Sequence, residues 1–174
     1  MFYKNLLFFG FIFLSACGFT PLNTTHDTTI TTDTAHIAIS PIPNAEGWQL
    51  KQLLVDKLNP THLNGEKKYT LDVNLNAPTF TDQSIQGDNF ASRETVYISA
   101  TYTLKEIQTN RILLTQSTGA RGAYNIVLEP YATQIARNRL KTDLIRTIGD
   151  NISIRIKAYF KAQEDIRESQ TISN

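Results

Sequence analysis

Residues 96–104 read Val-Tyr-Ile-Ser-Ala-Thr-Tyr-Thr-Leu, an alternation of apolar side chains with mostly hydroxyl-bearing ones. Successive side chains of a β-strand point to opposite faces of its sheet, so this period of two predicts a strand with one buried and one polar face. Residues 69–75, Tyr-Thr-Leu-Asp-Val-Asn-Leu, repeat the pattern. The chain therefore contains a sheet that needs cover on one face only.

The flanking segments extend this sheet. Residues 111–118 predict a strand that returns antiparallel to the first stretch through a tight turn at Gln108-Thr109-Asn110. A short apolar run at 36–41, ended by prolines, predicts the first strand of the chain. Residues 82–89, which contain Gly87-Asp88-Asn89, predict a loop.

Apolar residues at helical spacing predict two helices. The first runs from Trp48 to Leu58, and Asn59-Pro60 ends it. The second begins near Pro130 and extends for about eight turns, roughly 45 Å. Gly149-Asp150-Asn151 is a point at which this helix could kink or break. The two apolar stripes consist of Leu50, Leu53, Leu54 and Leu58, then Leu140, Leu144, Ile148, Ile152 and Ile156.

The order of elements is thus strand, helix, three strands, helix. Each helix must bury an apolar stripe, and each strand has one apolar face. The sequence therefore predicts an α+β fold, a two-layer sandwich in which both helices cover one face of a four-stranded mixed sheet. This domain spans residues 36–162. The polar segment 163–174 is expected to be a fraying tail.

The N-terminus has the layout of an export signal. Lys4 precedes an apolar stretch at 6–14, and Leu14-Ser15-Ala16-Cys17 follows. The apolar stretch is too short to span a bilayer, which takes about 20 residues. Small residues before a cysteine resemble a bacterial lipobox, so we expect residues 1–16 to be a lipoprotein signal peptide and Cys17 to receive a diacylglycerol. The alternative is an ordinary signal peptide with a chance cysteine.

Residues 17–35 then form the lipidated terminus and a threonine-rich tether. Two or three acyl chains would anchor the protein firmly, since each buried methylene contributes about 0.8 kcal/mol. Apart from this covalent lipid on Cys17, no cofactor is expected. Cys17 is the only cysteine among the 174 residues, so no disulfide framework is possible.

Composition and motifs argue against several functions. The formal net charge is +1, which provides no basic field for nucleic acid. His26, His36 and His62 lie apart in the sequence, so no metal site is expected. No Gly-x-Ser-x-Gly motif or paired carboxylates suggest a catalytic residue, so the chain is not expected to be an enzyme. The GxxG spacing of residues 119–122 follows a strand and is interpreted as a bend or bulge.

Three short motifs resemble a known family. Residues 17–22, Cys-Gly-Phe-Thr-Pro-Leu, are similar to the mature start of alphaproteobacterial LptE, the lipopolysaccharide-assembly lipoprotein. Ala123-Tyr124-Asn125, followed by Glu-Pro-Tyr-Ala-Thr at 129–133, resembles that family's entry to its long last helix. Residues 150–160 resemble the pattern that closes this helix. The resemblance covers the mature chain in element order, although the middle strands match only in pattern.

The resemblance implies a location and two partners. It implies an outer-membrane lipoprotein that faces the periplasm and plugs the lumen of a large β-barrel, LptD. It also implies help with assembling that barrel, and binding of lipopolysaccharide on its way to the cell surface. Gly18 agrees with outer-membrane sorting, where an aspartate would suggest retention at the inner membrane.

The residues themselves add two expectations. The polar sheet face carries Thr, Asn and Ser and almost no acidic group besides Asp72, which suits a polar barrel lumen. Arg and Lys pair with phosphate through charge-assisted hydrogen bonds, and lipid A carries phosphates. Four cations near the predicted hairpin are therefore candidates for lipopolysaccharide binding, with solubilising surface charge as the alternative: Arg93, Lys105, Arg111 and Arg121. The cations of the last helix, Arg137, Arg139, Lys141 and Arg146, are expected on its solvated face.

Two other functions remain open. One is an auxiliary lipoprotein for a phospholipid-type ABC transport system, which would co-purify with a periplasmic transporter complex in place of a large barrel. The other, of a different class, is a lipid-anchored envelope enzyme. A deep pocket lined with perturbed carboxylates or histidines would favour the enzyme.

Overall fold

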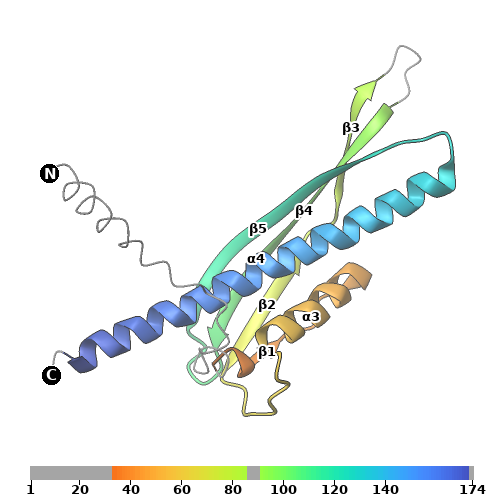
Figure 1. Ribbon diagram of the computed structural model, residues 1–174. Coiled ribbons are helices and arrows are strands. Elements are labelled where there is room, and N and C mark those ends of the chain that lie inside the picture. The colour runs from red at the N-terminus through yellow and green to blue at the C-terminus, as the bar shows by residue number, and fades with distance from the viewer. Residues whose placement is uncertain (1–32, 86–90, 173–174) are drawn as a thin grey trace, which may run out of the picture.

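The computed structural model describes residues 33–85 and 91–172 (Figure 1). The predicted signal peptide and Cys17 lie outside these residues. The elements follow in the order β1 (Ile37–Ile39), α3 (Asn44–Leu58), β2 (Tyr69–Leu75), β3 (Thr79–Ile85), β4 (Ala91–Glu106), β5 (Ile112–Asn125) and α4 (Pro130–Ile172). A helical turn at 33–35 precedes β1, and Thr34 and Ala35 in it are buried, so the end of the predicted tether is packed against the domain.

The sheet is mixed, as predicted. β1 pairs in parallel with β2, and β4 pairs antiparallel with β2, β3 and β5. β2 and β3 lie end to end along the same edge of β4, since Leu75 is opposite Ala100 and Thr79 is opposite Tyr97. Five strands therefore occupy four positions across the sheet.

The loop predicted at 82–89 is wrong for its first half, because Thr79–Ile85 forms β3. This segment reads Thr-Phe-Thr-Asp-Gln-Ser-Ile and has too few apolar residues to indicate a strand. Its backbone hydrogen bonds to β4 make it a strand all the same. The remaining predicted loop residues, 86–89, lie outside the described residues.

The hairpin between β4 and β5 turns where the sequence predicts. Asn110 adopts a left-handed φ of 54°, which asparagine tolerates better than most residues, and Glu106 N–H donates to Arg111 O at 2.9 Å. Of the bend or bulge predicted at residues 119–122, the bulge is wrong. These residues pair with β4 in unbroken register, from Ser99 to Val96, and the irregularity of the pair lies between Leu104 and Lys105.

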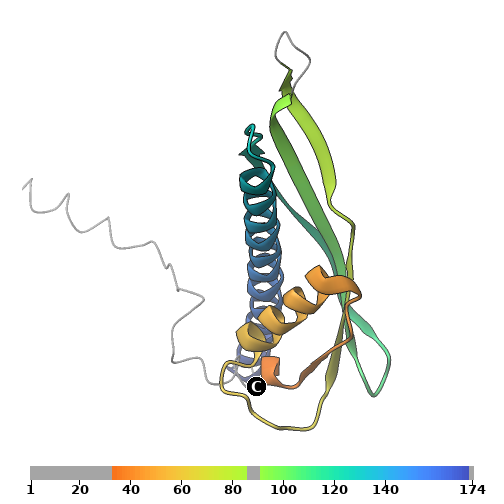
Figure 2. The ribbon, with the colours of Figure 1, turned by 90° about the vertical axis from the view of Figure 1, so that its right-hand side faces the viewer.

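Both helices cover the same face of the sheet, which confirms the two-layer sandwich (Figure 2). Helix α3 begins at Asn44, four residues before the predicted start. Helix α4 has 43 residues, about 65 Å at 1.5 Å per residue, and includes residues 163–172 of the segment predicted to fray. It continues unbroken through Gly149.

Gly149 has a packing role instead. A Cβ at this position would collide with Leu53, and it would also press on Leu50. The absence of a side chain therefore lets α4 approach α3 closely. Two ion pairs flank this contact, Lys57 to Asp150 at 2.5 Å and Glu46 to Lys141 at 2.6 Å. Glu46, near the start of α3, pairs with Lys141, and Lys57, near its end, pairs with Asp150 further along α4. The two helices therefore run in the same direction.

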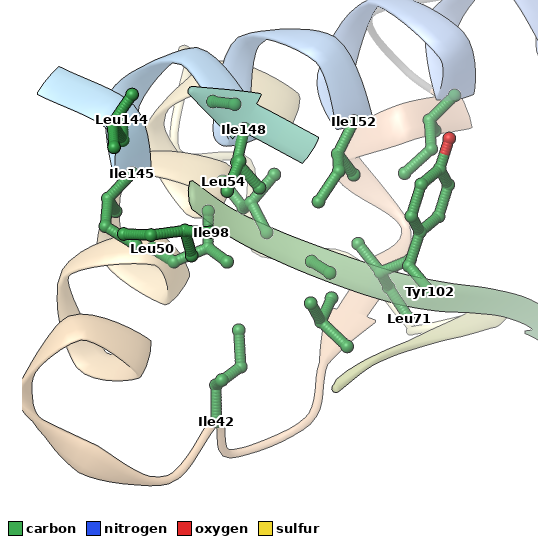
Figure 3. Close-up of a cluster of buried hydrophobic side chains, with 14 of the residues drawn as sticks. Ile42, Leu50, Leu54, Leu71, Ile98, Tyr102, Leu144, Ile145, Ile148 and Ile152 are labelled. Atoms are coloured by element: carbon green, nitrogen blue, oxygen red, sulfur yellow. The ribbon is translucent and has the colours of Figure 1, made fainter. Parts of the chain in front are cut away.

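The apolar core lies between the two helices and one half of the sheet (Figure 3). Leu50 and Leu54 of α3 and Ile148 and Ile152 of α4 are completely buried there, against Leu71 and Ile98 of the sheet. We call this part the core half: β1, α3, β2, residues 98–106 of β4, residues 112–118 of β5, and α4 from Lys141 to Phe160. The extended half consists of β3, residues 91–97 of β4, residues 119–125 of β5, and α4 from Pro130 to Leu140.

Candidate functional site

The face of the sheet opposite the helices is the first candidate, and we call it the open face. Strand register places Asp72 opposite Thr103, Asn74 opposite Thr101, and Thr103 opposite Thr115. Side chains on a sheet alternate, so the residues facing the helices are the apolar ones between these positions. The members of the open face that can form hydrogen bonds include Thr70, Asp72, Asn74, Thr79, Thr81, Gln83, Ser99, Thr101, Thr103, Thr115 and Ser117.

Asp72 is the one carboxylate that the register places on the open face of the described strands. Ser40 Oγ donates to its Oδ1 at 2.5 Å, and Lys105 Nζ pairs with its Oδ2 at 2.9 Å. The hydrogen bond from Ser40, followed by that from Lys105, lowers the pKa of Asp72 below its ordinary value. The charge is thus neutralised locally, and the open face is hydrogen-bonding without being acidic. A shallow hollow of about 400 Å³ lies here, lined in part by Ser40, Pro41 and Thr101.

The four candidate cations do not gather at one place. Lys105 is held by Asp72, and Arg111 Nε lies 3.8 Å from Glu106 at the hairpin turn. Arg93 lies 12 residues before Lys105 on the same strand, roughly 40 Å away at about 3.3 Å per residue. Arg121 lies opposite Tyr97, with its guanidinium 5.7 Å from the ring centroid. No single phosphate could contact all four.

A buried polar cluster in the extended half was not predicted. Glu94 is 8% exposed and accepts a short hydrogen bond from the Tyr124 hydroxyl. Arg137 of α4 donates from Nε to that hydroxyl oxygen at 2.6 Å and pairs with Glu94 Oε2 at 3.2 Å. Burial, reinforced by the bond to Glu94, raises the pKa of Tyr124, which keeps the phenol protonated. The Arg137 guanidinium also lies 5.4 Å from the Phe80 ring centroid, so the cluster joins β3, β4, β5 and α4.

The prediction that the cations of α4 lie on its solvated face is therefore wrong for two of the four. Arg137 belongs to the buried cluster, and Lys141 pairs with Glu46 of α3. The signal was present in the sequence, since residue 137 lies seven before Leu144 and so falls on the same helical stripe. Arg139 is exposed, and Arg146 makes an exposed pair with Asp143 at 3.1 Å.

The titratable side chains of the described residues do not form a catalytic arrangement. Within residues 33–85 and 91–172, no group of three or more His, Cys, Asp or Glu side chains is placed to hold a metal ion. The buried carboxylate of Glu94 accepts a hydrogen bond from Tyr124 and forms an ion pair with Arg137. His36 Nδ1 contacts the Glu66 carbonyl oxygen at 2.6 Å, and His62 lies in an exposed loop. No helix in the described part of the chain has the length and apolarity that crossing a bilayer requires.

Comparison with known proteins places the fold. No known family profile and no curated protein matches the chain. A lipoprotein from Caulobacter crescentus CB15 has a similar structure, with a TM-score of 0.61 and 18% identity over 78% of this chain and 97% of that one. Rare lipoprotein B from Shewanella oneidensis has a TM-score of 0.57 and 11% identity over 76% of this chain and 98% of that one. A minor lipoprotein from Acinetobacter baumannii has a TM-score of 0.53 and 20% identity over 70% of this chain and 90% of that one. The chain thus has the α+β fold of these lipoproteins, and at such identity the likeness concerns the fold.

Proposed function

We propose that the protein is an outer-membrane lipoprotein of the LptE type, which plugs an LptD-like β-barrel and assists lipopolysaccharide transport. The open face carries this proposal. It is a long surface rich in hydroxyl and amide groups, and its only carboxylate among the described strands, Asp72, is paired with Lys105 and accepts a hydrogen bond from Ser40. Such a surface can exchange hydrogen bonds with the polar interior of a barrel. The fold is like that of rare lipoprotein B, which agrees with a lipoprotein of this shape.

Anchoring through Cys17 is the second part of the proposal. The sequence around it has the lipobox pattern, and 15 residues separate it from Asp33, where the described domain begins. At up to about 3.4 Å per residue this segment reaches on the order of 50 Å, enough to let the domain sit away from the bilayer. Cells grown with labelled palmitate should label the natural protein, and the Cys17→Ser variant should remain unlabelled. Labelling of that variant would exclude Cys17 as the site.

Lipopolysaccharide binding by the four cations is the third part. Since Lys105 and Arg111 lie near the hairpin turn and Arg93 lies toward the other end of β4, we propose separate contacts, with Arg93, Lys105 and Arg121 on the open face and Arg111 at the turn. The variant Arg93→Ala/Lys105→Ala/Arg111→Ala/Arg121→Ala should bind lipopolysaccharide less tightly and remain folded by circular dichroism. A matched control removes four exposed cations on α4 and the 62–68 loop: Lys68, Arg139, Arg146 and Arg167. Equal binding by the quadruple variant and the natural protein would reject the role of these cations.

The test of the whole proposal is co-purification. The tagged mature lipoprotein is extracted in mild detergent, and its largest partner is identified by mass. A large outer-membrane barrel is the expected result, and depletion of the protein should lower lipopolysaccharide at the cell surface. Recovery of a periplasmic ABC transport complex would instead support the auxiliary role. Surface lipopolysaccharide that is unchanged after depletion would contradict the proposal.

A further inference from the structure

The outer edge of β5 is a long strand edge without a partner. Within the described residues, β5 (Ile112–Asn125) pairs with β4 and with no other strand. Its other edge therefore presents backbone N–H and C=O groups over much of 14 residues. Proteins commonly blunt such edges with proline or with short strands, and β5 has neither feature. An edge of this length can accept a further strand by main-chain hydrogen bonds.

An apolar groove runs beside this edge in the extended half. It lies between Ala123 and Tyr124 of β5 and one flank of α4, has a volume of about 480 Å³, and is lined mainly by apolar side chains. Small side chains at Ala132 and Ala136 keep it open, and Ile135 and Leu140 supply its larger apolar surface. The groove is therefore shaped to receive side chains from a strand that lies along β5.

Apolar surface continues past the groove at the loop between β5 and α4. Val127, Leu128 and Tyr131 are all exposed, and Leu128 is exposed completely. Thr133 fixes the loop, because its hydroxyl bonds to the backbone N–H and the carbonyl oxygen of Val127, each at 3.2 Å. Exposed apolar residues that are fixed in place beside an open strand edge are typical of a contact surface.

The positive charge near the β5 edge indicates that the added segment carries acidic side chains. Three arginines along this edge have no carboxylate partner among the described residues. Arg121 lies on the open face over Tyr97, Arg139 lines the groove, and Arg155 donates to Gln116 at 2.9 Å. The carboxylate that lines the groove, Asp143, is engaged by Arg146. A residue directly opposite Arg121 on an added strand would have its Cβ about 5 Å away, within reach of an ion pair.

We infer that the β5 edge and the adjoining flank of α4 bind an extended, acidic segment of a partner protein as an additional strand. Small apolar side chains of this segment alternate with polar ones. The apolar side chains enter the groove under α4, and acidic side chains on the other face meet Arg121. Main-chain hydrogen bonds provide affinity, while the groove and the arginines select the sequence. Except at Arg121, which lies on the open face, this interaction uses the strand edge and the flank of α4 and not the open face.

Site-specific photocrosslinking in the native envelope tests the inference. Photoreactive benzoylphenylalanine replaces Ala136 in the groove of the full-length lipoprotein, or Asn138 on an exposed side of the same helix as a control. After irradiation, the crosslinked residues of the partner are mapped by mass spectrometry. We expect a protein adduct from position 136 and not from 138. Its crosslinked residues should be spaced by two along one short segment, with acidic residues between them.

A second pair of variants tests the charges. Arg121→Ser should lower the yield of the adduct from position 136 by up to about fivefold, the effect of losing one favourable cross-strand ion pair. The control Lys68→Ser removes the same charge far from the groove and should leave the yield unchanged. Thermal melts followed by circular dichroism establish that each variant is folded.

Three results would overturn the inference. They are the absence of any adduct at position 136, an adduct with lipid alone, and a protein adduct whose residues show no spacing by two. A lipid adduct would assign the groove to an acyl chain. None of these results affects co-purification with a barrel, so this inference can fail while the proposed function stands.

Discussion

The two halves of the molecule are held together by different forces. In the core half, α3 adds a second helix beside α4, and the side chains between helices and sheet are almost entirely apolar. In the extended half α3 is absent (Figure 1), and Glu94, Tyr124 and Arg137 occupy the space between sheet and helix. The core half is therefore expected to determine global stability, whereas the extended half is attached through a polar cluster and leaves the groove beside β5 exposed.

The largest expected effect is the loss of an apolar side chain from the core half. Leu54→Ala leaves a cavity at a completely buried position of α3 and should lower the free energy of unfolding by about 2–5 kcal/mol. Leu140→Ala makes the same change at a half-buried position in the extended half, where the expected loss is about 1–2 kcal/mol. Urea unfolding at constant m-value measures both. Equal losses would contradict the distinction between the halves.

The next effect comes from the polar cluster. Arg137→Gln leaves the buried Glu94 without its cation, and we expect a loss of about 1–3 kcal/mol, reduced from that of a fully buried pair because Arg137 is partly exposed. Arg146→Gln, in an exposed pair, should change the free energy by less than about 0.5 kcal/mol.

A double-mutant cycle separates the pair from its parts. If Glu94 destabilises the single variant because it is an unpaired buried charge, then Glu94→Gln/Arg137→Gln should be more stable than Arg137→Gln alone. Additive losses would show that the two side chains do not interact. Hydrogen exchange of Arg137→Gln should quicken at β3 and at residues 119–125 of β5 before it changes in α3.

The smallest expected effect is at the ion pair between the helices in the core half. The hydrogen bond from Lys141 is the main cause that lowers the pKa of Glu46 from its ordinary value of 4.5. Because the folded-state pKa is the lower one, this contribution is present above pH 4.5 and disappears as the pH falls through the lowered pKa. Glu46→Gln should therefore cost under about 1 kcal/mol at pH 7 and nothing at a pH low enough to protonate Glu46. If the stability difference between Glu46→Gln and the natural protein grew toward acid pH, it would contradict this assignment.

The sequence predicted the core half better than the extended half. Period-two alternation in residues 69–75 and 96–104, and the leucine and isoleucine stripes of the helices, report apolar burial directly. β3 was missed because hydrogen bonding to β4, with little burial, makes it a strand. Gly149 was interpreted as a weak point because a helix propensity does not show that Leu53 packs against that position.

The candidate site divides in the same way. The alternation in the strands predicted the polar open face, since each apolar residue assigns its neighbours to the other side. The distance between Arg93 and Lys105 was not apparent from their shared location near the hairpin, because β4 is 16 residues long. The groove beside β5 depends on how α4 crosses the strand edge, which no local pattern encodes.

Hydrogen exchange of the isolated protein and of its barrel complex tests most directly whether the extended half opens locally and whether binding of the barrel at the open face suppresses that opening. In the isolated protein, we expect residues 119–125 of β5 to exchange through local opening, while β2 and α3 exchange only through global unfolding. In the complex, residues 119–125 should become protected by at least tenfold, and α3 should change little. Uniform protection of both halves in the isolated protein, or protection gained mainly at α3, would contradict the account.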